Sequence, residues 1–190
     1  MKITDITDFS YYENSVILNY DDLQKKIPLI ERLFRNSREY KNYISYIRES
    51  NDIRGCAFFT DKDTDDVDIE IHHIINLYSI CDIAGRKLLD TLDNDKFLFT
   101  YDILKEIIEI HMKDLIPVIS LTRTIHQFYH SGQYELPKNS KELHLGNYRK
   151  FIQEYKNYLN KEEISKIYTY FNDINNSEFN EFLEMSFKEE

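Results

Sequence analysis

Residues Val118–His130 read VISLTRTIHQFYH and combine two local signals. The β-branched and apolar first half predicts a strand. Thr122 then suits the N-cap of a helix, and Gly132 suits its end. We therefore expect a strand that passes directly into a short helix over Arg123–Ser131.

Four of the six histidines fall into two groups. His126 and His130 are four residues apart, so both imidazoles would lie on one face of the short helix, within reach of one ion. His72 and His73 end the segment 67–74, whose apolar and polar residues alternate as in a strand. One strand histidine added to the helix pair gives three nitrogen ligands, which leaves a coordination position open as in catalytic metal sites. The neighbouring histidine must point to the opposite face of the strand.

The rest of the chain predicts mostly helices with a few short strands. A β-like run over Cys56–Phe59 and an acidic turn over Asp61–Asp66 would form a hairpin with segment 67–74. Pro28 suits the first turn of a helix that extends to about Glu49. Further apolar stripes at helical spacing occupy residues 77–88, 103–112, 148–159 and 164–171, while residues 1–22 indicate a short strand or arm and 133–147 a polar connection.

Composition excludes several classes of protein. The 190 residues include 42% hydrophobic side chains, which is enough for a core, and the apolar runs are too short to span a membrane. Two cysteines exclude a four-cysteine zinc site and a disulfide scaffold, so a reducing cytoplasm is the expected compartment. The 24 Lys and Arg against 34 Asp and Glu give a charge of −10, which argues against indiscriminate coating of nucleic acid.

Ordinary explanations of the histidines stay open at this point. A His-x-x-x-His spacing on a helix can be incidental, and buried histidines are often satisfied by hydrogen bonds. His111 and His144 lie outside the two groups, and we interpret them as surface or helix-terminal residues.

The segments Asp68–Ile74 and Val118–His130 resemble the two halves of an HNH, or ββα-metal, endonuclease. Their His-His and His-x-x-x-His pattern is similar to that of colicin-type DNases. The region from Arg54 to Gly132 also resembles HNH-like proteins of large tailed phages. The resemblance implies a ββα-metal core over 51–132 with a helical insertion over 76–114. Together with an arm and helix over 1–50 and a C-terminal helical region over 133–190, both read from the residue patterns, this predicts a predominantly helical α+β fold.

The resemblance also implies a reaction, the hydrolysis of phosphodiester bonds in DNA. It assigns His72, His126 and His130 to one divalent metal ion, with zinc, magnesium, manganese and nickel as candidates, and His73 to the role of general base. Arg123, one turn before His126, would contact the phosphate, or else it is a solvated first-turn residue. The middle asparagine of the HNH pattern has no counterpart here.

A nuclease must bind a polyanion, so the acidic groups would have to lie away from the site. We expect them in the turn over Asp61–Asp66 and in the tail beyond residue 172. Candidate contacts to nucleic acid are Arg35, Arg38, Lys41, Lys138, Arg149 and Lys150.

Two other functions remain possible. The first is a non-catalytic phage protein that keeps the ββα-metal fold and binds a host or phage protein through its acidic surface. The second is a structural zinc site, for which His111 or Glu70 would supply a fourth ligand. The tyrosine-rich C-terminal helices could form a homodimer interface. We expect a phage protein of this kind to act in the host cytoplasm and to have no membrane partner.

Overall fold

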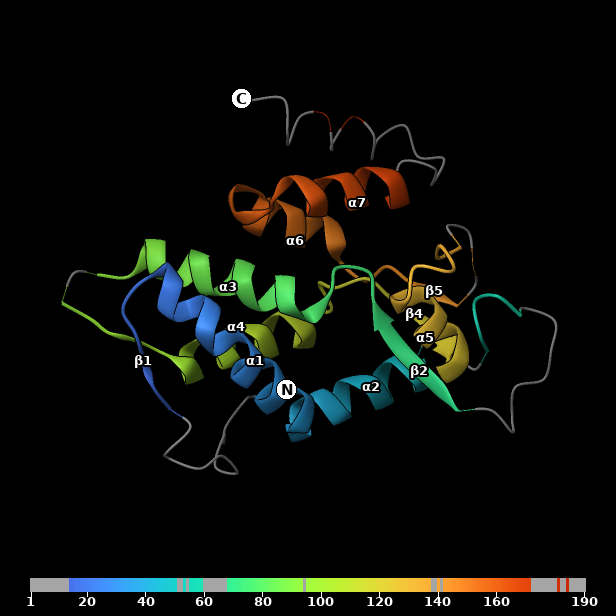
Figure 1. The fold of residues 1–190 in the computed structure, drawn as a ribbon, viewed down its shortest axis with the longest axis horizontal. Helices are drawn as coiled ribbons and strands as arrows, with labels where there is room; N and C mark the ends of the chain where they lie inside the picture. The colour runs from blue at the N-terminus through green and yellow to red at the C-terminus, as the bar shows by residue number, and fades with distance from the viewer. Residues whose placement is uncertain are drawn as a thin grey trace.

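The computed structural model describes residues 14–50, 53, 55–59, 68–93, 95–137, 140, 142–171, 181 and 184, and only the backbone of residues 50 and 168–171. Its elements are β1 (Val16–Ile17), α1 (Tyr20–Asn36), α2 (Arg38–Ser50), β2 (Ile69–His73), α3 (Leu77–Thr91), β3 (Leu98–Phe99), α4 (Thr100–Met112), β4 (Val118–Thr122), α5 (Arg123–His130), β5 (Leu143–His144), α6 (Tyr148–Tyr155), the 3₁₀ turn η2 (Lys156–Tyr158) and α7 (Lys161–Phe171). The predicted α+β, mainly helical class is confirmed (Figure 1).

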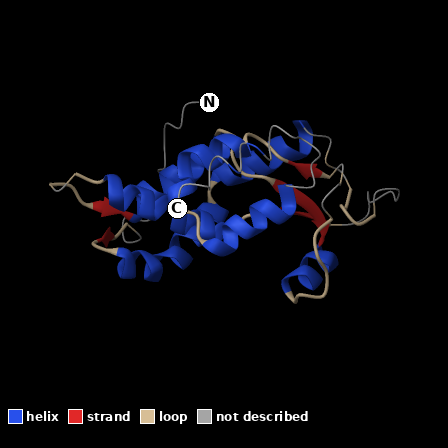
Figure 2. Ribbon diagram, turned by 90° about the horizontal axis from the view of Figure 1, so that it is seen from above, coloured by secondary structure: helices blue, strands red, loops and turns tan. Residues whose placement is uncertain are grey.

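Two small sheets lie at opposite ends of the helical body (Figures 1 and 2). β1 pairs with β3 at one end, and the order β2-β4-β5 forms an antiparallel sheet at the other. In the second sheet Ile71 lies opposite Ser120, and His73 lies opposite Val118. This register brings the end of the first histidine segment next to the strand that leads into α5.

The helix predicted from Pro28 to Glu49 is two helices, and this part of the prediction is wrong. Asn19 caps α1 by accepting a hydrogen bond from the backbone N–H of Asp22 (3.0 Å), so the helix begins well before Pro28. Ser37 separates α1 from α2 because its hydroxyl donates to the carbonyl of Phe34 (2.7 Å) and accepts from the N–H of Tyr40 (3.0 Å). One short polar side chain thus ends one helix and begins the next.

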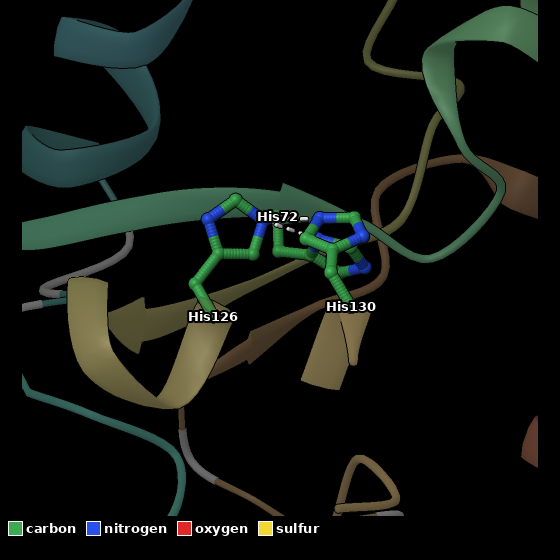
Figure 3. A group of neighbouring side chains, drawn as sticks. All are labelled: His72, His126 and His130. Atoms are coloured by element: carbon green, nitrogen blue, oxygen red, sulfur yellow. Dashed lines mark hydrogen bonds between the residues drawn. The ribbon is translucent and has the colours of Figure 1, made fainter. Parts of the chain in front are cut away.

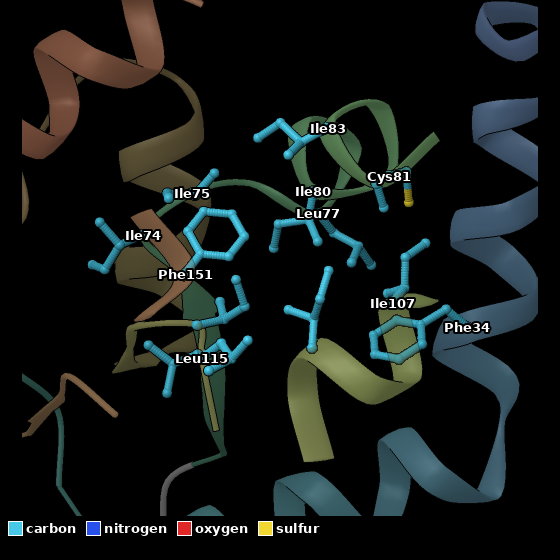
Figure 4. Packing of buried hydrophobic residues seen from close by; sticks show 14 of the residues in the cluster. Phe34, Ile74, Ile75, Leu77, Ile80, Cys81, Ile83, Ile107, Leu115 and Phe151 are labelled. Carbon is cyan, nitrogen blue, oxygen red and sulfur yellow. The ribbon is translucent and has the colours of Figure 1, made fainter. Parts of the chain in front are cut away.

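Helices α1, α3 and α4 pack together around the main hydrophobic core (Figure 4). The apolar stripes predicted over residues 77–88 and 103–112 are confirmed, since both face this core. The residues Leu77, Ile80, Ile103 and Ile107 are all at most 2% exposed. Buried residues from each of the three predicted segments, 1–50, 51–132 and 133–190, belong to the same cluster. The inserted helices therefore form much of the core of this chain.

The predicted hairpin between Cys56–Phe59 and segment 67–74 is not found among the described residues. Residues 56–59 form a turn, closed by a hydrogen bond from the N–H of Phe59 to the carbonyl of Cys56 (2.8 Å). The strand partner of β2 is β4, and Ala57 contributes one hydrogen bond to Ser120 of β4 (2.9 Å). The acidic turn over Asp61–Asp66 lies outside the described residues.

The connection predicted over 133–147 contains β5, which the sequence did not indicate. β5 is only Leu143–His144, too short to show an alternating pattern. The C-terminal helices are found as α6, η2 and α7, and Phe151, Tyr155 and Ile167 are buried in the chain's own core. These side chains do not offer a free surface, and the homodimer stays a prediction. Of the acidic tail, only residues 181 and 184 are described.

Across the described part of the chain, no helix combines the length and the apolar character needed to cross a membrane.

Candidate metal centre

Three histidines meet at the sheet formed by β2, β4 and β5 (Figure 3). His72 Nδ1 and His126 Nε2 are 2.9 Å apart, and His130 Nε2 is 2.9 Å from His126 Nε2. All three nitrogen atoms lie within 4.8 Å of one another. The predicted convergence of one strand histidine with the helical pair is found, and we call these residues the histidine cluster.

Local structure explains why the cluster forms. Thr122 caps α5 by accepting a hydrogen bond from the N–H of Ile125 (3.3 Å), so the helix begins immediately after β4. Helical spacing then places His126 and His130 on one face. The ring of Tyr129 packs against that of His72 with centroids 4.7 Å apart, which limits the rotation of His72.

Glu70 completes the surroundings of His126, and the sequence did not reveal this role. Its carboxylate contacts His126 Nδ1, the ring nitrogen that faces away from the other two histidines. An ionised carboxylate only accepts hydrogen bonds, so the proton resides on Nδ1 and the lone pair of Nε2 faces the cluster. A carboxylate bound to the outer nitrogen is the usual partner of a metal-ligating histidine. The i, i+2 spacing from His72, which places Glu70 on the same face of β2, was the available signal.

Burial disfavours the charged forms of His72 and His130. His72 is 6% exposed, and its pKa is lowered to about 3 by burial and by the neighbouring histidines. The pKa of His130 is also lowered, chiefly by partial burial and then by His126. Neutral imidazoles are the form that binds metal, so no proton has to be removed from His72 or His130 at neutral pH. His130 itself is exposed, which leaves the cluster open to solvent.

The donor set fits one divalent ion with an open coordination position. Imidazole nitrogen favours zinc and nickel over magnesium. Among the described residues, no fourth His, Cys, Asp or Glu joins the cluster. The two candidates for a fourth ligand lie elsewhere, because Glu70 binds the outer nitrogen of His126 and His111 lies against His73.

The structure does not support His73 as general base. Its side chain points to the opposite face of β2, is 4% exposed, and has its Nε2 atom 3.1 Å from Nε2 of His111. A base must reach both solvent and substrate, which this position prevents. His111 was expected at the surface or at a helix end; it lies in the last turn of α4, as the second alternative predicts, but is 1% exposed in the core. His144 pairs with Asp114, at 2.7 Å.

A family model matches residues 1–187, and its description is "bacteriophage G278-like virion protein". The chain belongs to this family. The predicted phage origin is confirmed, whereas the match gives no indication of an HNH endonuclease. Comparisons of this virion protein with curated proteins and with solved structures found no match.

Two arginines of this phage protein lie close to the histidine cluster. Arg123 is exposed at the start of α5, three residues before His126 and on the same helical face. Arg35, near the end of α1, is exposed and contributes a positive charge that lowers the pKa of both His72 and His130. The guanidinium of Arg35 is paired with Glu31 through two hydrogen bonds (2.8 and 3.1 Å), so an anion at the cluster would compete with this carboxylate.

The other predicted contacts to nucleic acid are dispersed. Arg38 and Lys41 are exposed on α2. Arg149 and Lys150 line an open hollow of about 450 Å³ at the start of α6, which shares no residue with the cluster. Lys138 lies outside the described residues.

Acidification is expected to destabilise the metal-free protein. Burial lowers the pKa of His111 to about 4 from an ordinary 6.5, and it lowers the pKa of His73 as well. In the unfolded chain His111 is protonated below about pH 6.5, whereas in the folded protein it stays neutral down to about pH 4. The free energy of unfolding therefore falls as the pH is lowered through this window. Between pH 7.5 and 5 His111 alone gives a loss of about 2 kcal/mol. Urea titrations with EDTA at both pH values measure it, and equal stabilities would contradict the assignment.

Proposed function

We propose that the histidine cluster binds one divalent metal ion and that this site hydrolyses phosphodiester bonds of DNA. The observation that carries the proposal is the meeting of three imidazole nitrogens from β2 and α5, with Glu70 on the outer nitrogen of His126. An antiparallel strand pair, β2 and β4, followed directly by the ligand helix α5 is also the arrangement expected of a ββα-metal endonuclease. A bound ion of this kind supplies Lewis acidity to a phosphate oxygen and lowers the pKa of water.

The side chains around the cluster have distinct tasks in this proposal. Glu70 holds the ring of His126 so that Nε2 faces the ion. Arg123 would contact a non-bridging oxygen of the phosphate through its exposed guanidinium, and Arg35 would do so from α1 if the phosphate displaces Glu31, its present partner. A proton released from the attacking water would pass to solvent at the open side of the cluster, beside His130, because His73 lies buried on the other face of β2.

Nicking of supercoiled plasmid tests the proposal. The wild-type protein should nick DNA with Zn²⁺, Ni²⁺, Mn²⁺ or Mg²⁺, and His130→Ala should reduce the rate by about a hundredfold or more, since a ligand is lost. His130 is exposed, so its replacement should leave the fold intact. His144→Ala is the matched control and should nick normally. Undiminished nicking by His130→Ala would refute the proposal.

A second function is favoured by one observation, the burial of His73. A metal site without an accessible base suits a non-catalytic virion protein in which the ion joins β2 to α5 and the acidic surface binds another protein. The two functions separate in one comparison. The non-catalytic protein would gain thermal stability from zinc and would show no nicking with any of the four ions.

A further inference from the structure

A second pair of histidines lies on the other face of β2. His73 Nε2 is 3.1 Å from Nε2 of His111, which comes from α4. The side chains are 4% and 1% exposed. Helix α4 belongs to the insertion between β2 and β4, so this contact joins the inserted region to the strand that carries His72.

The direction of this hydrogen bond follows from the third partner. His111 Nδ1 is 2.7 Å from the carbonyl oxygen of Ile107. A carbonyl only accepts, so Nδ1 of His111 carries the proton and its Nε2 is a bare acceptor. His73 must therefore donate from Nε2. Burial lowers the pKa of His111 to about 4, so this ring is neutral at pH 7, and its contact with the Ile107 carbonyl decides which nitrogen carries the proton.

Aromatic rings surround the pair. The ring of His111 lies 4.4 Å from that of Phe34 and 5.0 Å from that of Tyr43, and Tyr40 stacks over His73 at 6.1 Å. Water has little access to such a site. If the acceptor on His111 were removed, the N–H of His73 would stay unsatisfied in a dry environment, which disfavours this orientation of the ring.

We propose that His111 is a positioning residue of the metal centre and acts through His73. Successive side chains of a strand point in opposite directions, so the rotation of β2 about its axis sets His72 and His73 together. The bond to His111 fixes His73 on the core side, and this fixes the direction in which His72 presents Nδ1 to His126 and His130. This inference rests on the proposed metal site, and it gives the insertion a task in metal binding.

Zinc affinity of designed variants tests this role. His111→Leu fills the space but offers no acceptor, and it should weaken zinc binding by about tenfold, the low end for residues that orient a ligand. His111→Gln places a carbonyl oxygen near the lost nitrogen and should restore the affinity to within about threefold. Ile103→Ala is the matched control: Ile103 is fully buried on the same helix, so this variant loses stability but should bind zinc normally.

Two further measurements do not depend on activity. Long-range ¹H–¹⁵N spectra of the metal-free protein should show a protonated Nδ1 on His111 and a protonated Nε2 on His73. The visible spectrum of the Co²⁺-loaded His111→Leu protein should differ from that of the wild type, whereas the Ile103→Ala spectrum should not.

The outcomes separate this inference from the proposed function. If the wild type binds zinc and His111→Leu binds it equally tightly, His111 has no positioning role and the metal site survives. If Ile103→Ala weakens binding as much as His111→Leu, the effect is loss of stability and the inference also fails. If the wild type binds no zinc, this inference and the proposed function fail together.

Discussion

Replacement of His126 by alanine is expected to weaken zinc binding by more than about a hundredfold, since loss of an outer partner of a ligand alone costs about 10–100-fold. His126 is the central member of the cluster, because both of the 2.9 Å nitrogen contacts involve its Nε2 atom. Without it, His72 and His130 remain as two ligands from different elements, and two imidazoles bind zinc weakly. Competition with a chromophoric chelator at pH 7.5 measures the dissociation constant.

Two companion variants sharpen this result. Glu70→Gln keeps an acceptor for the Nδ1 proton of His126 but removes the charge, so a loss of about tenfold is expected. His144→Ala removes a histidine that pairs with Asp114 and should leave the zinc affinity unchanged. Wild-type affinity in His126→Ala would show that the cluster is not the metal site.

The largest effect on stability is expected from Phe34→Ala. Phe34 is fully buried, and its ring contacts Tyr40 (4.8 Å between centroids) and His111 (4.4 Å). Its removal leaves a cavity between α1, α2 and α4, which cannot collapse easily because each helix is held by other contacts. Truncation of a buried phenylalanine to alanine costs about 3–5 kcal/mol.

Urea denaturation in the presence of EDTA measures this loss without a contribution from bound metal. Phe97→Ala is the matched control, because Phe97 is 65% exposed and its truncation should change the free energy of unfolding by at most about 0.5 kcal/mol. A loss below about 1 kcal/mol for Phe34→Ala would contradict the packing described for this core.

The sequence predicts the helices that carry regular apolar stripes, because periodic burial is a local property. α3, α4 and α5 begin close to where their stripes and caps indicate. Pro28 was misleading because it lies inside α1 and not in its first turn, and the cap that starts this helix is Asn19. Cys56–Phe59 has strand-like residues, but β2 takes its partner from a distant segment, and no local pattern reports such a pairing.

The histidine cluster was predictable because each half of it is a local spacing: alternation on a strand and i, i+4 on a helix. The burial of the His73 side chain could not be predicted from the sequence. Alternation correctly places it opposite His72, but the covering of that face by His111 and its aromatic neighbours depends on how the insertion packs. The sequence suggested Glu70 only as a fourth ligand, because its contact with the outer nitrogen of His126 joins residues far apart along the chain.

X-ray absorption at the zinc edge of the zinc-loaded protein tests the central claim most directly. The proposed metal centre predicts one zinc ion per chain with three imidazole nitrogens at about 2.0–2.1 Å and one further light atom from solvent. His130→Ala should lose one of the three imidazole contributions. A spectrum with sulfur ligands, with four protein ligands, or with three imidazoles retained in His130→Ala would contradict a metal centre built from His72, His126 and His130.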